Sequence, residues 1–450
     1  MSEGSLGAPT RHPIDWENPE YFEKESLDLE LRRIFDICHG CRRCFNLCDS
    51  FPRLFDLIDD SQTGELDSVP SSKFGYVVDA CTLCDLCFMT KCPYVPPHEF
   101  NVDFPHLMLR YRAVEKRFGK VSRNKEQLSN TDRNGKWLGP FATLVNWSNK
   151  LSNKFTRNVI QKLIGIKQTA VLPKFYHKSF AARAKTKTPT INVNAPAFGR
   201  KAVLYATCFV NYNNPQIGEA TRKVLARNGV ETEVIYPHCC GMPKLEHGDL
   251  EAVAENARKV SQEMGSWINN GYDIIALVPS CALMLKFEWP LILPNDENVK
   301  NLSSATYDIA EYLVNIAKKE GIAEGLEPIP NGVTVHLACH SRAQNIGAKA
   351  AEMLRLIPQT DISVIERCSG HGGSWGMMES NFEIGMKIGK PVVSKAIEKL
   401  PSVVVSECPL AGMHILQGIE RNVKETDKLL VPQTVFHPIE LLAEAYSTRS

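Results

Sequence analysis

The sequence lacks any long uninterrupted run of apolar residues. Nowhere in its 450 residues do about eighteen apolar residues follow one another, as a membrane-spanning helix would need. The richest stretch, residues 273–285, is cut by Pro279 and suits a buried strand. Residues 1–30 also lack the basic segment and apolar core of a signal or transit peptide. We therefore expect a cytoplasmic protein that does not cross a membrane.

The sequence also lacks the glycine-rich fingerprints of nucleotide cofactor sites. The segment "CSGHGGSWG" at 368–376 fails the G-x-G-x-x-G test because Trp375 occupies the last glycine position, and no Walker pattern occurs. We expect neither a flavin nor a nicotinamide site, so electrons would have to be exchanged with other proteins or small carriers. No nucleic-acid-binding motif occurs either, and we expect no nucleic-acid partner.

Acidic residues are scarce between residues 121 and 201. This segment holds sixteen Lys and Arg against Glu126 and Asp132, although the whole chain has a net charge of only +1. We expect a solvated connector face; anionic lipid, an acidic partner or nucleic acid are the alternatives. Residues 143–166 predict one amphipathic basic helix that packs on its own protein, with a membrane surface or a partner groove as alternatives. Its apolar residues are Leu144, Trp147, Leu151, Phe155, Val159 and Leu163.

Cysteine, in contrast, is abundant and clustered. Fifteen cysteines in an odd, tightly grouped set argue against a disulfide framework in a reducing compartment and favour metal binding. Eight of them form two runs, which we call the first and second cysteine runs. The first run holds Cys38, Cys41, Cys44 and Cys48, and the second holds Cys81, Cys84, Cys87 and Cys92.

Each run fits the C-x2-C-x2-C spacing that wraps three thiolates around one [4Fe–4S] cluster. In two-cluster ferredoxins the fourth cysteine of each run ligates the other cluster. We therefore assign one cluster to Cys38, Cys41, Cys44 and Cys92, and the second to Cys81, Cys84, Cys87 and Cys48. Zinc, which also takes four thiolates, and bare thiols remain alternatives. Two departures from the usual pattern, Asp49 in place of proline and the four-residue spacer before Cys92, remove no ligand.

The remaining seven cysteines belong to an internal repeat. Apolar strands and amphipathic helices alternate twice, and equivalent cysteines lie 131, 129 and 127 residues apart. Strands are predicted at 201–208, 231–241 and 272–281 in the first repeat and at 332–339, 361–370 and 402–408 in the second. Such alternation implies parallel sheets with right-handed crossovers, and the cysteines should lie just beyond the carboxyl ends of the strands.

The duplicated C…CCG…C pattern resembles the cysteine-rich CCG domains of heterodisulfide reductase catalytic subunits and of the corresponding subunit of anaerobic glycerol-3-phosphate dehydrogenase. The order of parts resembles that family over residues 31–425. The resemblance implies an α+β multidomain fold, in which a helical, ferredoxin-like domain with two clusters precedes duplicated α/β CCG domains with parallel sheets. We expect an N-terminal tail at 1–30, the two-cluster domain at 31–120, a basic helical connector at 121–199, and repeats at 200–325 and 326–450.

The resemblance also implies a cluster at a repeat, which in heterodisulfide reductase is a noncubane [4Fe–4S] form with five cysteines per motif. The first repeat offers Cys208, Cys239, Cys240 and Cys281, but Met284 stands in the fifth position. In the second repeat Ser369 and Ala411 replace two cysteines. We expect a third iron–sulfur cluster in the first repeat, and zinc or a further cluster in the second. The candidate ligands of the second repeat are Cys339, Cys368, Cys408, His340 and His371.

Three hypotheses of function follow. The first is an iron–sulfur electron-transfer subunit that passes electrons between the two ferredoxin-type clusters and the repeat cluster. Its partner would be a flavoprotein dehydrogenase or an iron-containing oxidoreductase, with peripheral contact at the inner face of the cell membrane. The second is a catalytic subunit that reduces a disulfide or a quinone, with Cys239 and Cys240 as candidate catalytic residues. The third is a zinc-stiffened docking scaffold.

Overall fold

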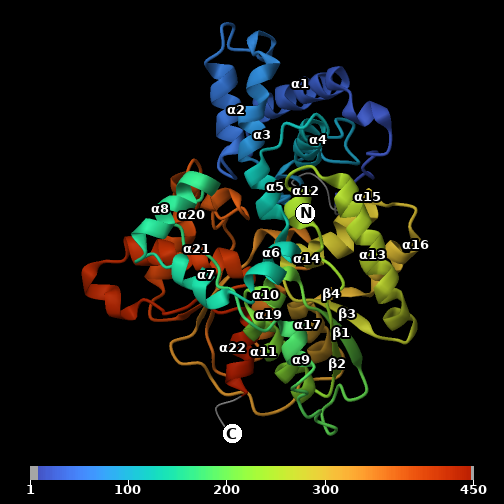
Figure 1. The fold of residues 1–450 in the computed structure, drawn as a ribbon, viewed down its shortest axis with the longest axis vertical. Coiled ribbons are helices and arrows are strands. Elements are labelled where there is room, and N and C mark those ends of the chain that lie inside the picture. Colours follow the sequence, from blue (N-terminus) through green and yellow to red (C-terminus); the bar gives the residue numbers. More distant parts are fainter. Residues whose placement is uncertain (1–8, 447–450) are drawn as a thin grey trace.

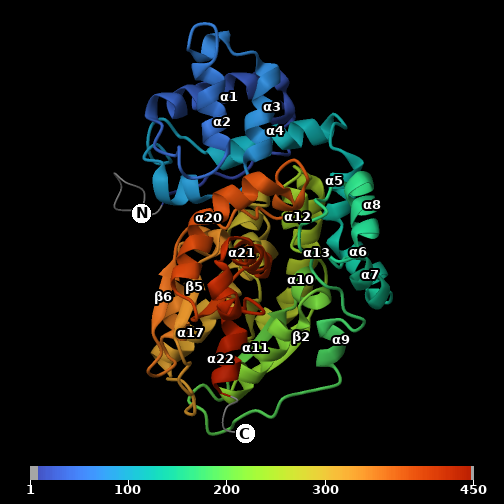
Figure 2. The same cartoon turned by 90° about the vertical axis from the view of Figure 1, so that its left-hand side faces the viewer.

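A computed structural model describes residues 9–446. Figures 1 and 2 show a helical N-terminal part at one end of the molecule, above two α/β units that stand side by side. The N-terminal helices bury apolar residues at helical spacing, for example Leu27, Leu31 and Ile34 on the first helix, against one shared core. These helices are α1 (Lys24–Cys41), α2 (Ser50–Asp59), α3 (Phe74–Ala80) and α4 (Phe104–Arg117).

The basic connector runs down one side of the molecule as five short helices (Figure 2). They are α5 (Arg123–Ser129), α6 (Thr131–Leu138), α7 (Ala142–Ser148), α8 (Lys154–Ile164) and α9 (Phe180–Ala184). The single helix predicted over 143–166 is wrong, because the chain leaves helix after α7 and the Asn153 side chain caps a new one at Thr156. Its expected packing is also wrong, since the side chains of Leu144 and Phe155 are 62% and 79% exposed.

The first repeat is built on a four-stranded parallel sheet with the strand order β2-β1-β3-β4. Its strands are β1 (Lys201–Tyr205), β2 (Glu231–Ile235), β3 (Asp273–Ala276) and β4 (Thr306–Asp308). The predicted strands are confirmed, whereas β4 is an addition to them. The helices are α10 (Cys208–Tyr212), α11 (Pro215–Arg227), α12 (Met242–Leu245), α13 (Leu250–Asn269), α14 (Pro279–Leu283), α15 (Trp289–Ile292), α16 (Glu297–Ala305) and α17 (Ile309–Lys319).

The second repeat has a three-stranded parallel sheet with the order β6-β5-β7. Its strands are β5 (Val333–His336), β6 (Ile362–Ile365) and β7 (Val403–Ser406), as predicted. A single parallel bridge from Val405 to Phe436 takes the place of a fourth strand. The helices are α18 (Cys339–Ala343), α19 (Lys349–Leu354), α20 (Phe382–Glu398), α21 (Pro409–Asn422) and α22 (Pro438–Ala445).

The two repeats exchange their last helices. Helix α17, at the end of the first repeat, packs on α19 of the second, and α22, at the end of the second, packs on α11 of the first. Both exchanged helices begin with a capping box, at Asp308 and at His437. Most buried residues of the two repeats join one core that also includes the N-terminal helices, while α20 and α21 pack with β6 and β7 in a smaller core of their own. This packing brings the strand ends of both sheets toward the N-terminal part (Figure 2).

Candidate cofactor sites built from cysteines

The two N-terminal cysteine runs lie in loops that follow helices. Helix α1 carries Cys38 and Cys41 in its last turn and ends at Arg42, whose φ of 52° turns the chain away. The second run follows α3, where Leu83 and Asp85 also adopt positive φ and wind the loop. The first run therefore begins on the last turn of α1 and continues into a loop, and the second runs from the loop after α3 into the short helical segment Cys87–Lys91.

The thiols group across the two runs. The pKa of Cys38 is raised well above its usual value by burial and then by the charges of Cys92, Cys44 and Cys41. The pKa of Cys48 is raised by burial and then by the charges of Cys84 and Cys81. The fourth cysteine of each run thus lies with the first three of the other. This grouping is the one that the crossed assignment of ligands requires.

The two groups adjoin each other at Cys87. Burial raises the pKa of this thiol, and the charges of Cys84, Cys44 and Cys81 raise it further, so thiols of both groups lie near it. So many thiolates cannot share this space without a compensating cation. A cationic metal centre bound here would supply that compensation and would hold its thiols deprotonated.

In the first repeat, four thiols meet beyond the carboxyl ends of neighbouring strands. The Sγ atoms of Cys239 and Cys208 lie 3.7 Å apart, and those of Cys240 and Cys281 lie 3.2 Å apart. Hydrogen bonding with Cys208 and Cys240 lowers the pKa of Cys239. Hydrogen bonding with Cys239, and then burial, raises the pKa of Cys208, and hydrogen bonding with Cys239 and Cys281 raises the pKa of Cys240. Cys239 is therefore the thiol of this set that is held most readily as a thiolate.

Side chains from the connector close over this site. Thr131 donates a hydrogen bond through Oγ1 to the Cys239 sulfur at 3.3 Å, and the Cys239 backbone N–H donates to the Asp132 carboxylate at 2.9 Å. Asp132 also accepts from the Tyr236 hydroxyl and lies 2.8 Å from Nδ1 of His238. The sequence interpretation misses this contact. The available signal was that Asp132 is one of only two acids in the basic segment.

In the second repeat, Cys339, Cys368 and Cys408 lie together beside the second cysteine run. Burial raises the pKa of Cys339, and the next causes are the charges of Cys84, Cys368 and Cys408. Burial also raises the pKa of Cys84, and the charge of Cys368 is the next cause. The Gly370 N–H donates to the Cys368 sulfur at 3.3 Å. A thiol of the N-terminal part therefore faces the thiols of this repeat.

The two candidate histidines of the second repeat have different surroundings. The His340 Nε2 lies 3.4 Å from the Leu83 carbonyl oxygen, which ties α18 to the second cysteine run. His371 packs its ring edge-on against His414, with the ring centres 5.6 Å apart. Burial, and then the charge of His414, lower the pKa of His371 to about 3. Burial also lowers the pKa of His340, so both imidazoles stay neutral at physiological pH.

The three positions that depart from the five-cysteine pattern are filled by buried residues. Met284 is fully buried, and Ser369 and Ala411 are also buried. The methionine sulfur and the serine hydroxyl offer no thiolate. The first repeat therefore keeps four thiols and the second keeps three.

The donor set is compatible with two kinds of metal centre. Within residues 9–446, no three His, Cys, Asp or Glu side chains converge closely enough to hold one metal ion. Zinc needs four donors at about 2.0–2.3 Å from one point. An iron–sulfur cluster carries its irons at separate corners and so spreads its thiolate ligands more widely. All of these candidate donors are thiols, which suit both zinc and an iron–sulfur cluster.

Comparison with known proteins agrees with this arrangement. A family model described as "Cysteine-rich domain" and named CCG matches residues 202–286 and 333–415, which lie in the two repeats. The chain is thus a protein with two CCG domains. This result confirms the resemblance on which the sequence interpretation rests. The CCG domains each begin at a first strand and extend past the last cysteine of their repeat.

The chain is also homologous to several characterised proteins. It is 26% identical to a subunit of the anaerobic glycerol-3-phosphate dehydrogenase of Escherichia coli (strain K12), over 71% of this chain and 76% of the relative. It is 27% identical to a subunit of the fumarate reductase (CoM/CoB) of Methanothermobacter marburgensis, over 55% of this chain and 47% of the relative. It is 26% identical to lactate utilization protein A of Geobacillus thermodenitrificans, over 54% of this chain and 98% of the relative.

Proposed function

We propose that this CCG-domain protein is an iron–sulfur electron-transfer subunit of an oxidoreductase complex. The relatives named above include a subunit of a dehydrogenase and a subunit of a reductase, which supports a role in such a complex. In this proposal the N-terminal part is a ferredoxin-like domain with two [4Fe–4S] clusters, held by the two crossed groups of thiols. When bound, the clusters supply one-electron transfer, and the protein supplies position, burial and hydrogen bonds to sulfur.

The observation that carries the proposal is the contact between the second cysteine run and the second repeat. Cys84 interacts with Cys368 and Cys339, so the thiols continue from the N-terminal part into the CCG domains. Within the CCG domains, α14 carries Cys281 and packs on α18, which begins with Cys339. The proposed route therefore runs from the first group through the second group and the second repeat to the first repeat.

The first cysteine run is the proposed point of electron exchange with a partner. Its loop is the most exposed part of the proposed route: Arg42 and Arg43 are exposed, and Phe45 is 50% exposed. Exposed aromatic and arginine side chains are enriched where proteins dock. We propose that a flavoprotein dehydrogenase or an iron-containing oxidoreductase binds here, at the end of the molecule that is uppermost in Figure 1.

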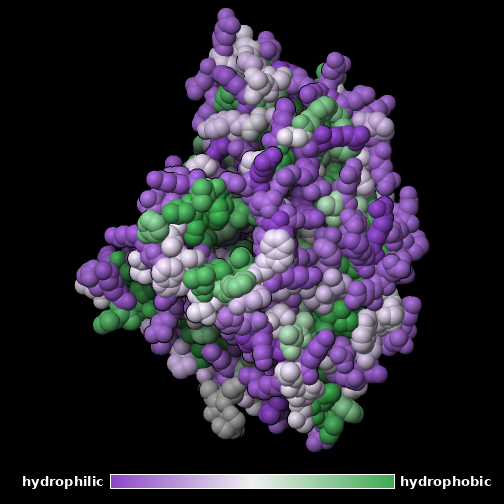
Figure 3. Space-filling model, in the orientation of Figure 1, coloured by the Kyte–Doolittle hydropathy of each residue, from purple (hydrophilic) through white to green (hydrophobic). Residues whose placement is uncertain are grey.

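The connector is the proposed surface for peripheral contact with an anionic membrane. Figure 3 shows apolar side chains gathered over α7 and α8. Trp147 is 53% exposed and Leu163 is 69% exposed, while the lysines at 150, 154 and 162 are exposed around them. Exposed apolar side chains flanked by lysines suit the interface of an anionic bilayer. No helix among residues 9–446 is long and apolar enough to span a bilayer.

A second candidate function places catalysis at the first repeat. The observation that favours it is the polar network of Asp132, Tyr236 and His238 around Cys239, which the second repeat does not reproduce around Cys368. Reduction of a disulfide or a quinone consumes protons as well as electrons, and the half-exposed His238 links this network to solvent. The electron-transfer proposal predicts no turnover with either substrate when reduced viologen supplies electrons.

The deciding experiment is anaerobic purification followed by iron, zinc and acid-labile sulfide analysis with EPR of the oxidised and reduced protein. About twelve irons or more, with a signal that disappears in Cys240→Ser, support a cluster in the first repeat. About eight irons with only coupled cubane signals would confine the clusters to the N-terminal part and contradict the longer route. Zinc in place of iron would support the scaffold hypothesis instead. The variant Cys84→Ser removes a proposed ligand of the second group and should weaken that group's signal while the first group keeps its signal.

A further inference from the structure

A large basic cavity lies beneath the connector, on the face of the first repeat formed by α11. Its volume is about 860 Å³, within the range of small-molecule sites. The lining comes from α7, from α9 with the loops on either side of it, and from α11. Neither cysteine run and none of the repeat thiols lines it. The cavity is therefore distinct from the proposed cofactor sites.

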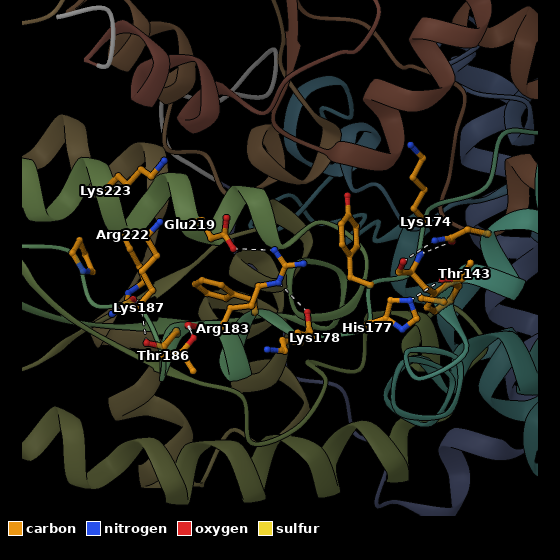
Figure 4. A pocket seen from close by; sticks show the side chains of 17 residues that line it. Thr143, Lys174, His177, Lys178, Arg183, Thr186, Lys187, Glu219, Arg222 and Lys223 are labelled. Carbon is orange, nitrogen blue, oxygen red and sulfur yellow. Dashed lines mark hydrogen bonds and ion pairs between the residues drawn. The ribbon is translucent and has the colours of Figure 1, made fainter. Parts of the chain in front are cut away.

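The charges around this cavity are unbalanced. Six lysines and arginines line it, against one carboxylate, Glu219, which pairs with Arg183 at 3.0 Å. All four lysines of the lining make no ion pair within the described part of the chain. They are Lys174, Lys178, Lys187 and Lys223. Figure 4 shows these cations distributed along the cavity, with Lys187 and Arg222 at one end and Lys174 at the other.

Arg222 gives an independent indication of a missing anion. The residue is only 7% exposed, and its Nη1 donates to the Ala184 and Lys187 carbonyl oxygens, while its buried Nε has no hydrogen-bond partner among the described residues. Burial lowers its pKa, with the distant charge of Glu233 only partly opposing this. A buried cation without a counter-charge is costly, and an anion in the cavity would compensate it. Because two carbonyls fix the guanidinium, it is preorganised for such a ligand.

The cavity also has apolar walls and excess room. Phe175, Phe180 and Pro189 contribute to the lining between the cations. A bare phosphate ion would leave most of 860 Å³ empty, whereas an organic body would pack against these rings. Helix α7, which lines the cavity with Ala142 and Thr143, carries exposed Leu144 and Trp147 on its outer side. An apolar tail could therefore leave the cavity onto the apolar surface over α7.

We propose that this cavity binds an organic phosphate with an apolar body, held by Arg222 and the lysines around it. Phosphate oxygens accept several charge-assisted hydrogen bonds at once, which matches the cations spread over three segments of chain. The ligand could come from two sources, a phospholipid headgroup or a free phosphorylated metabolite. The first predicts that acyl chains strengthen binding, and the second predicts that they do not.

The test is calorimetric titration of the full-length, cluster-loaded protein with three probes. These are inorganic pyrophosphate, monomeric dihexanoyl phosphatidic acid, and glycerol 3-phosphate. Tighter binding of the dihexanoyl lipid assigns the cavity to a lipid, and equal or tighter binding of the soluble phosphates assigns it to a free metabolite. If no probe binds, or if binding survives the variants described next, the proposal is overturned.

The variants separate the cavity from general charge. The double variant Lys187→Ala/Lys223→Ala removes two exposed cations of the lining and should weaken binding about tenfold or more, because each contact to phosphate is charge-assisted. Lys395→Ala, an exposed lysine on α20 outside the lining, is the matched control and should leave binding unchanged. Equal loss in both would show non-specific attraction and contradict the proposal. Arg222→Gln should abolish binding while the EPR signals of the clusters, recorded on the same sample, remain.

Discussion

Replacing Arg11 should loosen the second cysteine run, because this one side chain ties together three parts of the molecule. Its guanidinium lies 2.9 Å from Asp85 in the second run, 2.7 Å from Asp103 at the start of α4 and 3.3 Å from Glu288 in the first repeat. It also lies over the Phe88 ring at 4.5 Å. The Arg11 side chain is 12% exposed, and those of Asp85 and Glu288 are 6% and 4% exposed.

The expected magnitude follows from this burial. Arg11→Met keeps the apolar stem but leaves the three carboxylates without their guanidinium partner, while the His106 ring lies 3.3 Å from Glu288 and 3.4 Å from Asp103. Removing one partner from a buried ionic cluster costs about 3–5 kcal/mol. At neutral pH we expect a loss of this size in the free energy that opens residues 81–92, measured by native-state hydrogen exchange. The second group of thiols should lose iron before the first group does.

The matched control is Arg258→Met. Arg258 is 50% exposed and pairs with Glu17, itself 70% exposed, at 3.5 Å. A surface pair of this kind is worth about 0–1 kcal/mol, so opening of residues 81–92 should not change measurably. If these amides were protected equally in Arg11→Met and Arg258→Met, the buried ionic cluster would not be what holds the second cysteine run.

Three further predictions concern the repeats. Burial lowers the pKa of His336 to about 4, so the unfolded chain binds a proton at this residue first as the pH falls below about 6.5. Of the stability lost between pH 7 and pH 5, His336 should account for about 2 kcal/mol, which chemical denaturation should show as a loss smaller by that amount in His336→Gln. Gly370→Ala should destabilise the second repeat by roughly 3 kcal/mol or more in the same assay, because φ of Gly370 is +76° and an added Cβ would overlap the Gly385 carbonyl oxygen. The control is Gly265→Ala on helix α13, where an added Cβ meets open space and should stabilise the protein. Thr131→Val removes a hydrogen bond to the Cys239 sulfur and should lower the reduction potential of the cluster proposed in the first repeat, whose EPR signal Cys240→Ser abolishes. A redox titration should show unchanged potentials for the N-terminal clusters.

The strands of both repeats could be predicted because most are short apolar runs and each is followed within a few residues by a cysteine. Residues such as Val333 and Val335 are buried, as expected for a parallel sheet covered on both faces. Strand β4 could not be predicted, since its three residues, Thr306–Asp308, carry no apolar run of their own. The position of the cysteines beyond the strand ends follows from parallel topology alone. The fold of the repeats is therefore largely a consequence of local pattern.

The contacts between segments were beyond that kind of reasoning. The exposure of Phe155 contradicts the expected packing of the connector, because periodicity shows that a helix has an apolar face but not what covers it. The contact of Asp132 with the Cys239 backbone joins residues 107 positions apart and leaves no periodic signal. The same holds for Arg11 and Glu288, which lie 277 positions apart. Such contacts depend on tertiary packing, which the spacing of residues in one sequence does not encode.

The exchange of last helices explains how the two repeats could diverge without loss of fold. Helix α22 packs on α11 and α17 packs on α19, so each repeat is completed by apolar contacts from the other and not by its cysteines. Substitution of a thiol by Ser369 or Ala411 therefore removes a ligand while the buried core remains. The second repeat could then lose part of its ligand set and still present Cys339 and Cys368 to Cys84. Its contact with the second cysteine run is thus retained by packing, while the fuller set of thiols and the polar network around Cys239 lie in the first repeat.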